Sequence, residues 1–339
     1  MRAARRRGAG AMGVGLVVAV ALVLARPGRR ARRRRRPVPP AGLGGDARPR
    51  ARADGLLERV GRRRAHQRWI DTDGKPATRI DFTVPVDGLA APWRMAQIVY
   101  VYDGARVARP PRSIPAMLEW ALANPGRLTH PTPRNFLGAT FLKQALYELA
   151  PDPAVLQRPA TDQSFAATSA PLWAWYERLR PALWRQGRQF PESGSAQRQL
   201  LADGEIDISI SFNPSEASTS IANGLLPGSV RTFVLERGTI GNASFVAIPF
   251  NAAHRDGALV VANFLLSPEA QAHAQDPRAL GASTVLDLPR LEPADRQRFV
   301  DLPRGVATLS PAELGRPLLE PHPSWMTRLT ADWERRYAR

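Results

Sequence analysis

The alternation of apolar and polar positions predicts several strands in the later part of the chain. Residues 205–212, EIDISISF, alternate strictly, with the isoleucines and Phe212 on one face, and they predict the clearest strand in the sequence. Residues 96–103, AQIVYVYD, predict a buried strand, and residues 238–250 predict a turn followed by an apolar strand.

Segments with one apolar face predict helices between these strands. The pattern favours helices over residues 113–126, 140–150 and about 256–266. A longer helical region over 163–187 contains Pro171 and Pro181, which we expect to break or kink it. Strands and helices that alternate in this way are typical of an α/β fold.

The head of the chain lacks such a pattern. Residues 11–25 are apolar and follow four arginines, as in an export signal, so we expect residues 1–25 to be a signal peptide or a membrane anchor. Residues 26–70 are rich in arginine and show neither a helical nor a strand period. We therefore expect an irregular segment there and place the folded body at 71–339.

The charge of the chain is concentrated in this head. The formal net charge is +18, but residues 1–68 hold 20 of the 48 Lys+Arg and 3 of the 30 Asp+Glu, which leaves 28 basic and 27 acidic residues for the body. A nucleic-acid binder is expected to carry a basic stripe on its folded part. The nearly neutral body gives no sign of one, so we expect no nucleic-acid partner. A basic tail that binds nucleic acid or a membrane surface stays an alternative.

The composition and motifs narrow the chemistry further. The chain has no cysteine, which excludes disulfides, thiolate metal sites, a cysteine nucleophile and a lipid-modified N-terminal cysteine. It has no G-x-S-x-G, no P-loop and no H-E-x-x-H segment, and its five histidines are scattered. We expect no catalysis, no metal and no cofactor, with an α/β hydrolase-like enzyme as the alternative.

Several segments together resemble a known family. ISFNPSEAS, GTIGNASFVAIPFNA, VVANFLLSPEAQ and LLEPHPSW are similar to segments of the extracellular solute-binding proteins of ABC importers, family 1, and within it of the YnjB-type members related to thiamine-, iron- and polyamine-binding proteins. The similarity extends from about residue 71 to residue 337. The resemblance implies two α/β lobes in a periplasmic-binding-protein fold, a small polar solute in the cleft between them, a membrane permease and an ATPase as partners, and a periplasmic, monomeric protein.

The resemblance also implies how the two lobes are joined. This chain departs from the family at the start of the first lobe. We expect crossing strands near residues 93–103 and 231–250. Family members begin the first lobe with a strand-helix-strand stretch, where this chain has only LGGDARPRARADGLLERVGR. We therefore expect the first lobe to be incomplete at its N-terminus, and a shifted reading frame or misplaced start is one explanation of the arginine-rich head.

Polar residues at element boundaries are the candidates for solute contact. Asn135, with Gly138 and Thr140, opens a predicted helix, and Asn242 with Ser244 opens a predicted strand. Asn213 follows the alternating strand and precedes Pro214 and Glu216, which predicts a capping box and places Asn213 at the carboxyl edge of a sheet, where α/β proteins bind ligands. For each residue, local capping is the alternative.

Two aromatic residues complete the candidate set. Trp93 and Tyr100 bracket the first crossing strand and could stack on a flat or cationic solute. Packing in the core is the alternative for both. The full candidate site is Trp93, Tyr100, Asn135, Thr140, Asn213, Asn242 and Ser244.

Overall fold

The computed structural model describes residues 66–338, which form a mixed helix-strand molecule. The strands are β1 (Ile80–Asp81), β2 (Val84–Pro85), β3 (Ala90–Gln97), β4 (Val99–Asp103), β5 (Ile208–Ser211), β6 (Val230–Phe233) and β7 (Gly241–Ala247). The helices are α2 (Ile114–Ala123), α3 (Phe136–Leu149), α4 (Asp162–Leu179), α5 (Gly194–Ala202), α6 (Glu216–Ala222), α7 (Arg255–Leu265), α8 (Pro268–Gln275), α9 (Pro293–Val300), α10 (Pro311–Leu314) and α11 (Pro323–Tyr337). Short 3₁₀ turns lie at Gln67–Trp69, Pro76–Thr78, Pro153–Gln157, Arg180–Ala182, Trp184–Gly187 and Leu288–Arg290. The expectations for residues 1–25 and 26–65 fall outside the described residues.

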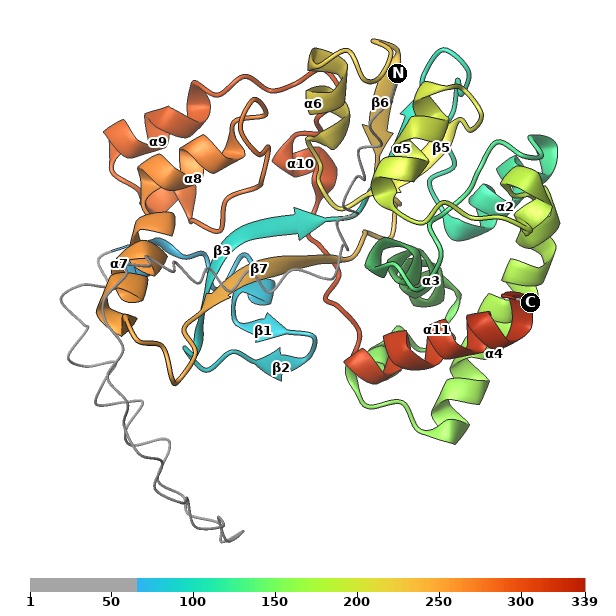
Figure 1. Cartoon of the computed structure of the whole chain (residues 1–339), viewed down its shortest axis with the longest axis horizontal. Coiled ribbons are helices and arrows are strands. Elements are labelled where there is room, and N and C mark those ends of the chain that lie inside the picture. Colours follow the sequence, from blue (N-terminus) through green and yellow to red (C-terminus); the bar gives the residue numbers. More distant parts are fainter. Residues whose placement is uncertain (1–65, 339) are drawn as a thin grey trace, which may run out of the picture.

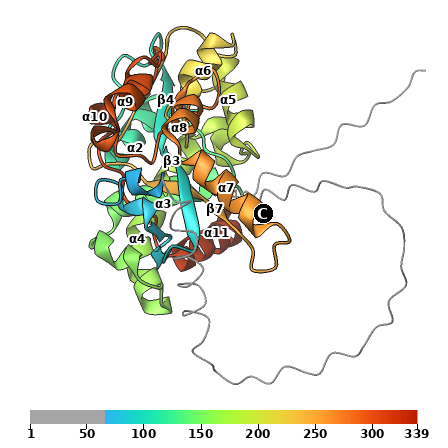
Figure 2. The ribbon, with the colours of Figure 1, turned by 90° about the vertical axis from the view of Figure 1, so that its left-hand side faces the viewer.

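Two groups of elements form two lobes (Figure 1). In the first lobe, β3 pairs with β7, and a core that includes Met95, Ala243 and Leu286 joins this ribbon to α8 and α9. In the second lobe, β4 lies between β5 and β6, and α2, α3, α4 and α11 surround a larger core beside it. Figure 2 shows α7, α8 and α9 together on one side of the molecule.

Three chain segments pass from one lobe to the other. One of them runs from α9 to α11, and within it the backbone of Leu318 donates to the carbonyl of Thr239 and accepts from the N–H of Gly241, both at 2.9 Å. β3 runs into β4 across Ile98, while the segment from β6 to β7 returns antiparallel, so that β4 pairs with β6 and β3 with β7. The backbone N–H of Ile98 donates to the carbonyl of Ile240 at 2.8 Å, and that of Gln97 donates to the carbonyl of Phe212 at 3.2 Å. The C-terminal end of β5 therefore meets the crossing point.

Several predicted elements are confirmed with shifted boundaries. The α/β fold is confirmed, and Ser113 caps α2 by accepting a hydrogen bond from the backbone of Ala116. The helix expected at 140–150 begins one turn earlier, at Phe136, because Asn135 serves as its N-cap. Pro171 lies inside α4 without ending it, and the helix stops at Leu179 ahead of Pro181.

Two local expectations are wrong. The predicted strand at 96–103 is split at Ile98, where the chain changes partners between the two sheets. Asn213 does not cap α6: the N-cap is Ser215, without a side-chain cap bond, and no capping box forms with Glu216. Since β4 runs antiparallel to both neighbours, its sheet also lacks the common carboxyl edge on which the placement of Asn213 was based.

Candidate functional site

The open face of the β3–β7 ribbon brings three of the predicted residues together. Ser244 lies opposite Arg94 and Asn242 lies opposite Ala96, so all four share the face opposite Met95 and Ala243 of the first-lobe core. Trp93 is the extra residue of a bulge between Pro92 and Arg94. The bulge holds the Trp93 ring under the Arg94 guanidinium, 5.0 Å from the ring centre.

Arg94 is the cation of this face. Its Nε donates to Ser244 Oγ at 3.1 Å, and partial burial lowers its pKa. Asn242 reaches in another direction, with its Nδ2 3.4 Å from Oε1 of Glu320. The two strands therefore present a guanidinium, a hydroxyl and an amide side by side.

Three half-buried phenylalanines from three segments meet next to this face. Phe136 begins α3 and stacks on Phe212, which follows β5, with ring centres 5.1 Å apart at 21°. Phe82, from the tight turn between β1 and β2, meets Phe136 edge to face at 6.0 Å. Because Phe82 belongs to the segment before β3 and the other two belong to the second lobe, the cluster spans the junction of the lobes.

A buried ion pair lies beneath the phenylalanines. Lys143 of α3 is fully buried, and its Nζ lies 2.5 Å from Oε2 of Glu320. The ammonium also faces the rings of Phe136 and Phe82, at 4.5 and 5.3 Å from their centres. Burial lowers the pKa of Lys143 and raises that of Glu320, while their attraction opposes both changes.

Asp81 supplies a second carboxyl at the junction. Burial raises its pKa, and its charge raises the pKa of Glu320. Asp81 directly precedes Phe82, whose ring lies 5.3 Å from the Lys143 ammonium that pairs with Glu320. We call the set Asp81, Phe82, Trp93, Arg94, Phe136, Phe212, Asn242, Ser244 and Glu320 the junction site.

Asn135 and Asn213 flank the junction site but use their side chains locally. Asn135 accepts from the backbone of Leu137 at 2.9 Å and donates to the carbonyl of Glu192 at 3.2 Å. Asn213 accepts from the backbone of Ser215 at 2.9 Å and donates to the carbonyl of Leu280 at 3.0 Å. Each amide is thus engaged in holding a turn next to Phe136 or Phe212.

Tyr100 and Thr140 do not belong to the site. Tyr100 is 1% exposed and stacks on Phe233 within the second-lobe core, so its ring cannot reach a solute in this conformation. Thr140 is fully buried and donates to the carbonyl of Phe136, one turn earlier in α3. Gly138 serves packing, because a Cβ there would lie 2.1 Å from the carbonyl oxygen of Pro131. For Tyr100, Gly138 and Thr140, the structure therefore favours packing in the core over contact with a solute.

Sequence reasoning missed most of the charged and aromatic members of the site. Asp81, Phe82, Arg94, Phe136, Phe212 and Glu320 carry no local motif. Lys143 did have a signal, because it is one of only two lysines in a chain whose other basic residues are arginine, and it stands in an apolar helix. A buried cation at that place implies a buried carboxylate partner.

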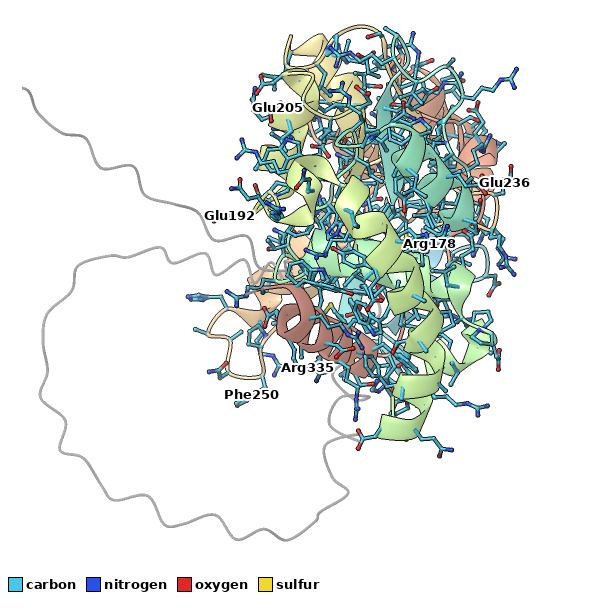
Figure 3. All side chains as sticks on the ribbon, turned by 90° about the vertical axis from the view of Figure 1, so that its right-hand side faces the viewer. Arg178, Glu192, Glu205, Glu236, Phe250 and Arg335 are labelled. Atoms are coloured by element: carbon cyan, nitrogen blue, oxygen red, sulfur yellow. The ribbon has the colours of Figure 1, made fainter. Side chains whose placement is uncertain are left out.

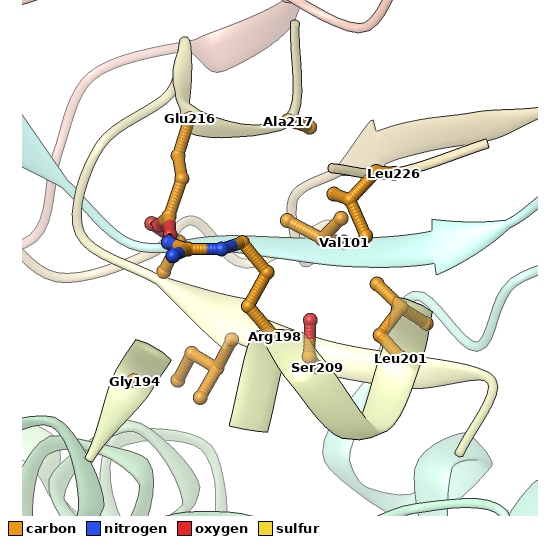
Figure 4. A pocket seen from close by; sticks show the side chains of 10 residues that line it. Val101, Gly194, Arg198, Leu201, Ser209, Glu216, Ala217 and Leu226 are labelled. Atoms are coloured by element: carbon orange, nitrogen blue, oxygen red, sulfur yellow. Dashed lines mark hydrogen bonds and ion pairs between the residues drawn. The ribbon is translucent and has the colours of Figure 1, made fainter. Parts of the chain in front are cut away.

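A separate small cavity lies within the second lobe. It holds about 10 Å³, room for at most one water molecule, between α5, β5 and α6 (Figure 4). The ion pair of Arg198 with Glu216, 2.6 Å apart, covers it. This cavity is too small for a solute.

Residues 66–338 offer neither a metal-binding group nor a membrane-spanning helix. No group of three or more His, Asp or Glu side chains is arranged to hold a metal ion in this part of the chain. No helix there has the length and apolar content needed to cross a membrane. His130, which is fully buried, lies 2.9 Å from the hydroxyl of Tyr176 through Nε2, and burial lowers its pKa to about 4.

Comparisons with known proteins agree on one family. A family model described as bacterial extracellular solute-binding protein matches residues 46–285. Over 269 residues the chain is 40% identical to Protein YnjB of Escherichia coli (strain K12), covering 79% of this chain and 68% of that protein.

Solved structures with little sequence identity share the fold. The Tp0655 (TpPotD) lipoprotein of Treponema pallidum superposes with a TM-score of 0.56 at 14% identity, covering 85% of this chain and 82% of that chain. An ABC transporter structure from Clostridium perfringens ATCC 13124 gives a TM-score of 0.52 at 17% identity, covering 79% and 77%.

Proposed function

This chain belongs to the bacterial extracellular solute-binding proteins, and from that premise we propose that it captures a small polar solute at the junction site. It is the substrate-binding component of an ABC importer, and we propose a membrane permease and its ATPase as the partners that receive the solute. The neighbours in family and fold are solute-binding proteins, which favours binding without catalysis over the hydrolase-like alternative.

One observation carries the placement of the solute: polar and aromatic side chains from both lobes converge where the chain crosses between them. Arg94 and Asn242 come from the first-lobe ribbon, whereas Phe136 and Phe212 come from the second lobe. Ligand sites between domains combine apolar walls with a few fixed polar groups in this way. Arg94 and Asp81 are also only half buried, so part of each remains accessible.

The crossing segments supply a hinge for the two lobes. We propose that the body at 71–339 closes over the solute by bending near Ile98, Ile240 and Leu318, where the three crossing segments lie side by side and are joined by backbone hydrogen bonds. The body's near-neutral charge supports a small solute rather than a nucleic acid as its ligand. A periplasmic, monomeric protein, exported by residues 1–25, completes the proposal.

The test is a binding screen of the full-length protein, followed by titration calorimetry. A thermal-shift panel of thiamine, its phosphates, spermidine, phosphocholine and sugars selects the compound for calorimetry. Asn242→Ala removes an amide from a desolvated site, a cost of about 1–3 kcal/mol, and should weaken binding roughly tenfold to hundredfold. Phe136→Ala should weaken it about tenfold.

Phe250 offers a matched control for Phe136. Its ring is 92% exposed on the loop after β7, where it points away from the body (Figure 3). Phe250→Ala should therefore leave affinity unchanged. The site is misplaced if Asn242→Ala and Phe136→Ala bind as tightly as the parent protein, and the function itself fails if no compound of a broad metabolite panel binds.

A further inference from the structure

The junction site contains two half-buried charges of opposite sign that no described residue neutralises. Asp81 makes no ion pair and its side chain makes no hydrogen bond within residues 66–338. Burial raises the pKa of this carboxyl, and no cation acts to lower it. A carboxylate that loses water without gaining a partner destabilises the folded protein. A charged partner supplied by a bound solute would explain why an aspartate stands at position 81.

Arg94 is the second such charge. Its Nε bonds to Ser244, but its two terminal amino groups have no partner among the described residues, and no described carboxylate lies within ion-pair distance. Burial lowers the pKa of this guanidinium as well, with no acidic group to oppose the change. Its free amino groups keep the fork geometry that suits a carboxylate or a phosphate.

The two charges occupy different ends of the same face. Asn242 and Ser244 are two residues apart on β7, which places them about 7 Å from each other. Arg94 is bonded at the Ser244 end. Asp81 precedes Phe82, whose ring faces the ammonium that pairs with Glu320, and Glu320 contacts Asn242 at the other end. A bound molecule along the face would meet a cation at one end and a carboxylate at the other.

The aromatic rings at the carboxylate end suit an organic cation. Phe82 directly follows Asp81, and the Lys143 ammonium already packs against Phe82 and Phe136 from the buried side. Because Glu320 neutralises the Lys143 ammonium, the ring faces that Lys143 does not contact can stabilise a second positive charge. At the other end, Trp93 backs Arg94 and keeps the guanidinium in place.

We propose that the solute class is zwitterionic: a positively charged group binds Asp81 beside Phe82, and an anionic group binds Arg94 beside Ser244. This inference rests on the proposed function at the same site. A neutral sugar would leave both charges without partners, and a simple cation or anion would leave one of them. A molecule with both groups pairs each charge at once.

Calorimetry with matched probes tests the proposal on the full-length protein. Phosphocholine and 6-aminohexanoate are zwitterions of different charge separation, and choline, inorganic phosphate, hexylamine and hexanoate represent their single charges. At least one zwitterion should bind tenfold or more tightly than either of its singly charged counterparts. Glucose serves as the neutral probe.

Two isosteric variants assign the ends. Asp81→Asn should weaken the zwitterion and the cations roughly tenfold to hundredfold and leave the anions unchanged, while Arg94→Gln should do the reverse. Asp87→Asn and Arg109→Gln are matched controls at exposed positions and should bind as the parent does. Without solute, Asp81→Asn should keep or raise the thermal midpoint, because it removes an uncompensated charge.

Three results would overturn the proposal. One is that neither zwitterion binds more tightly than its singly charged counterparts. Another is that Asp81→Asn and Arg94→Gln leave the affinity of the bound zwitterion unchanged, and the third is that Asp81→Asn lowers the thermal midpoint without solute. If glucose or another neutral compound binds and Phe136→Ala weakens it, the charge assignment fails while the proposed function stands.

Discussion

The buried ion pair between Lys143 and Glu320 makes a sharp prediction about stability. Lys143→Met keeps the length and apolar stem of the side chain but removes the ammonium, so Glu320 loses its ion-pair partner at 3% exposure. Among residues 66–338, only the Asn242 amide, at 3.4 Å, would remain as a partner of this carboxyl. Breaking a buried pair in this way costs about 3–5 kcal/mol, a large share of the roughly 5–15 kcal/mol that stabilises a typical domain.

The sign of the pH dependence follows from the same geometry. Burial raises the pKa of Glu320 in the folded protein, and removal of Lys143 takes away the charge that lowers it. In the variant, Glu320 holds a proton in the folded state, whereas in the unfolded chain it releases that proton above about pH 4.5. The stability of the variant therefore falls as pH rises above this value, and it recovers as pH falls through the folded pKa of Glu320. The deficit of Lys143→Met should therefore be smaller at pH 5 than at pH 8.

Urea unfolding, followed by tryptophan fluorescence, measures the free energy of unfolding of Lys143→Met. Glu320→Gln and the double variant complete a double-mutant cycle. The double variant should recover at least about 2 kcal/mol relative to the sum of the single losses, because neither charge is then left alone. A loss below about 1 kcal/mol in Lys143→Met, or an equal loss when Glu320 is already Gln, would refute the ion pair as a stabilising contact.

Three further predictions concern single positions. Thr83→Gly should raise stability by about 1 kcal/mol in thermal unfolding, because Thr83 holds a φ of 68° that a β-branched residue adopts only under strain, and no gain would show that the turn is unstrained. Tyr100→Phe should not lower stability and should leave solute affinity unchanged, since its buried hydroxyl has no partner within residues 66–338; a loss in either measurement contradicts this. His130 is held neutral with its pKa lowered to about 4, so stability should fall by about 3 kcal/mol as pH drops from about 6.5 toward 4, and His130→Phe should flatten that part of a pH titration of unfolding.

The sequence predicted those parts of the fold that depend on neighbours along the chain. Ser113 caps its helix as expected, and the alternating segment at 205–212 contains β5. Asn213 shows the limit of local patterns. Its amide oxygen accepts from the N–H of Ser215, before the helix begins, and its amide nitrogen donates to the carbonyl of Leu280, 67 residues away. The strand at 96–103 divides because the two sheets exchange partners at Ile98, which no local period encodes.

From the sequence, only those members of the junction site could be predicted that lie together on the paired strands β3 and β7. Asn242 and Ser244 are two apart on one strand, so a shared face follows from the strand period, and Trp93 joins them because β3 is their partner. The phenylalanine cluster depends on three segments that meet in space, and a single sequence contains no measure of that meeting. Tyr100 has the same strand environment as a binding residue would, but it faces the core.

The absence of cysteine from the chain allows one direct test of solute binding at the junction. Ala96→Cys places the only thiol opposite Asn242, on the face between the two lobes, and Leu89→Cys places one at a position that is 71% exposed and outside the site. The rate of alkylation by a small maleimide is measured with and without a saturating concentration of the compound that calorimetry shows to bind. We predict that the solute slows alkylation of the Ala96→Cys variant at least tenfold and leaves the Leu89→Cys variant unchanged. Equal rates at Ala96→Cys with and without bound solute would contradict binding at the junction.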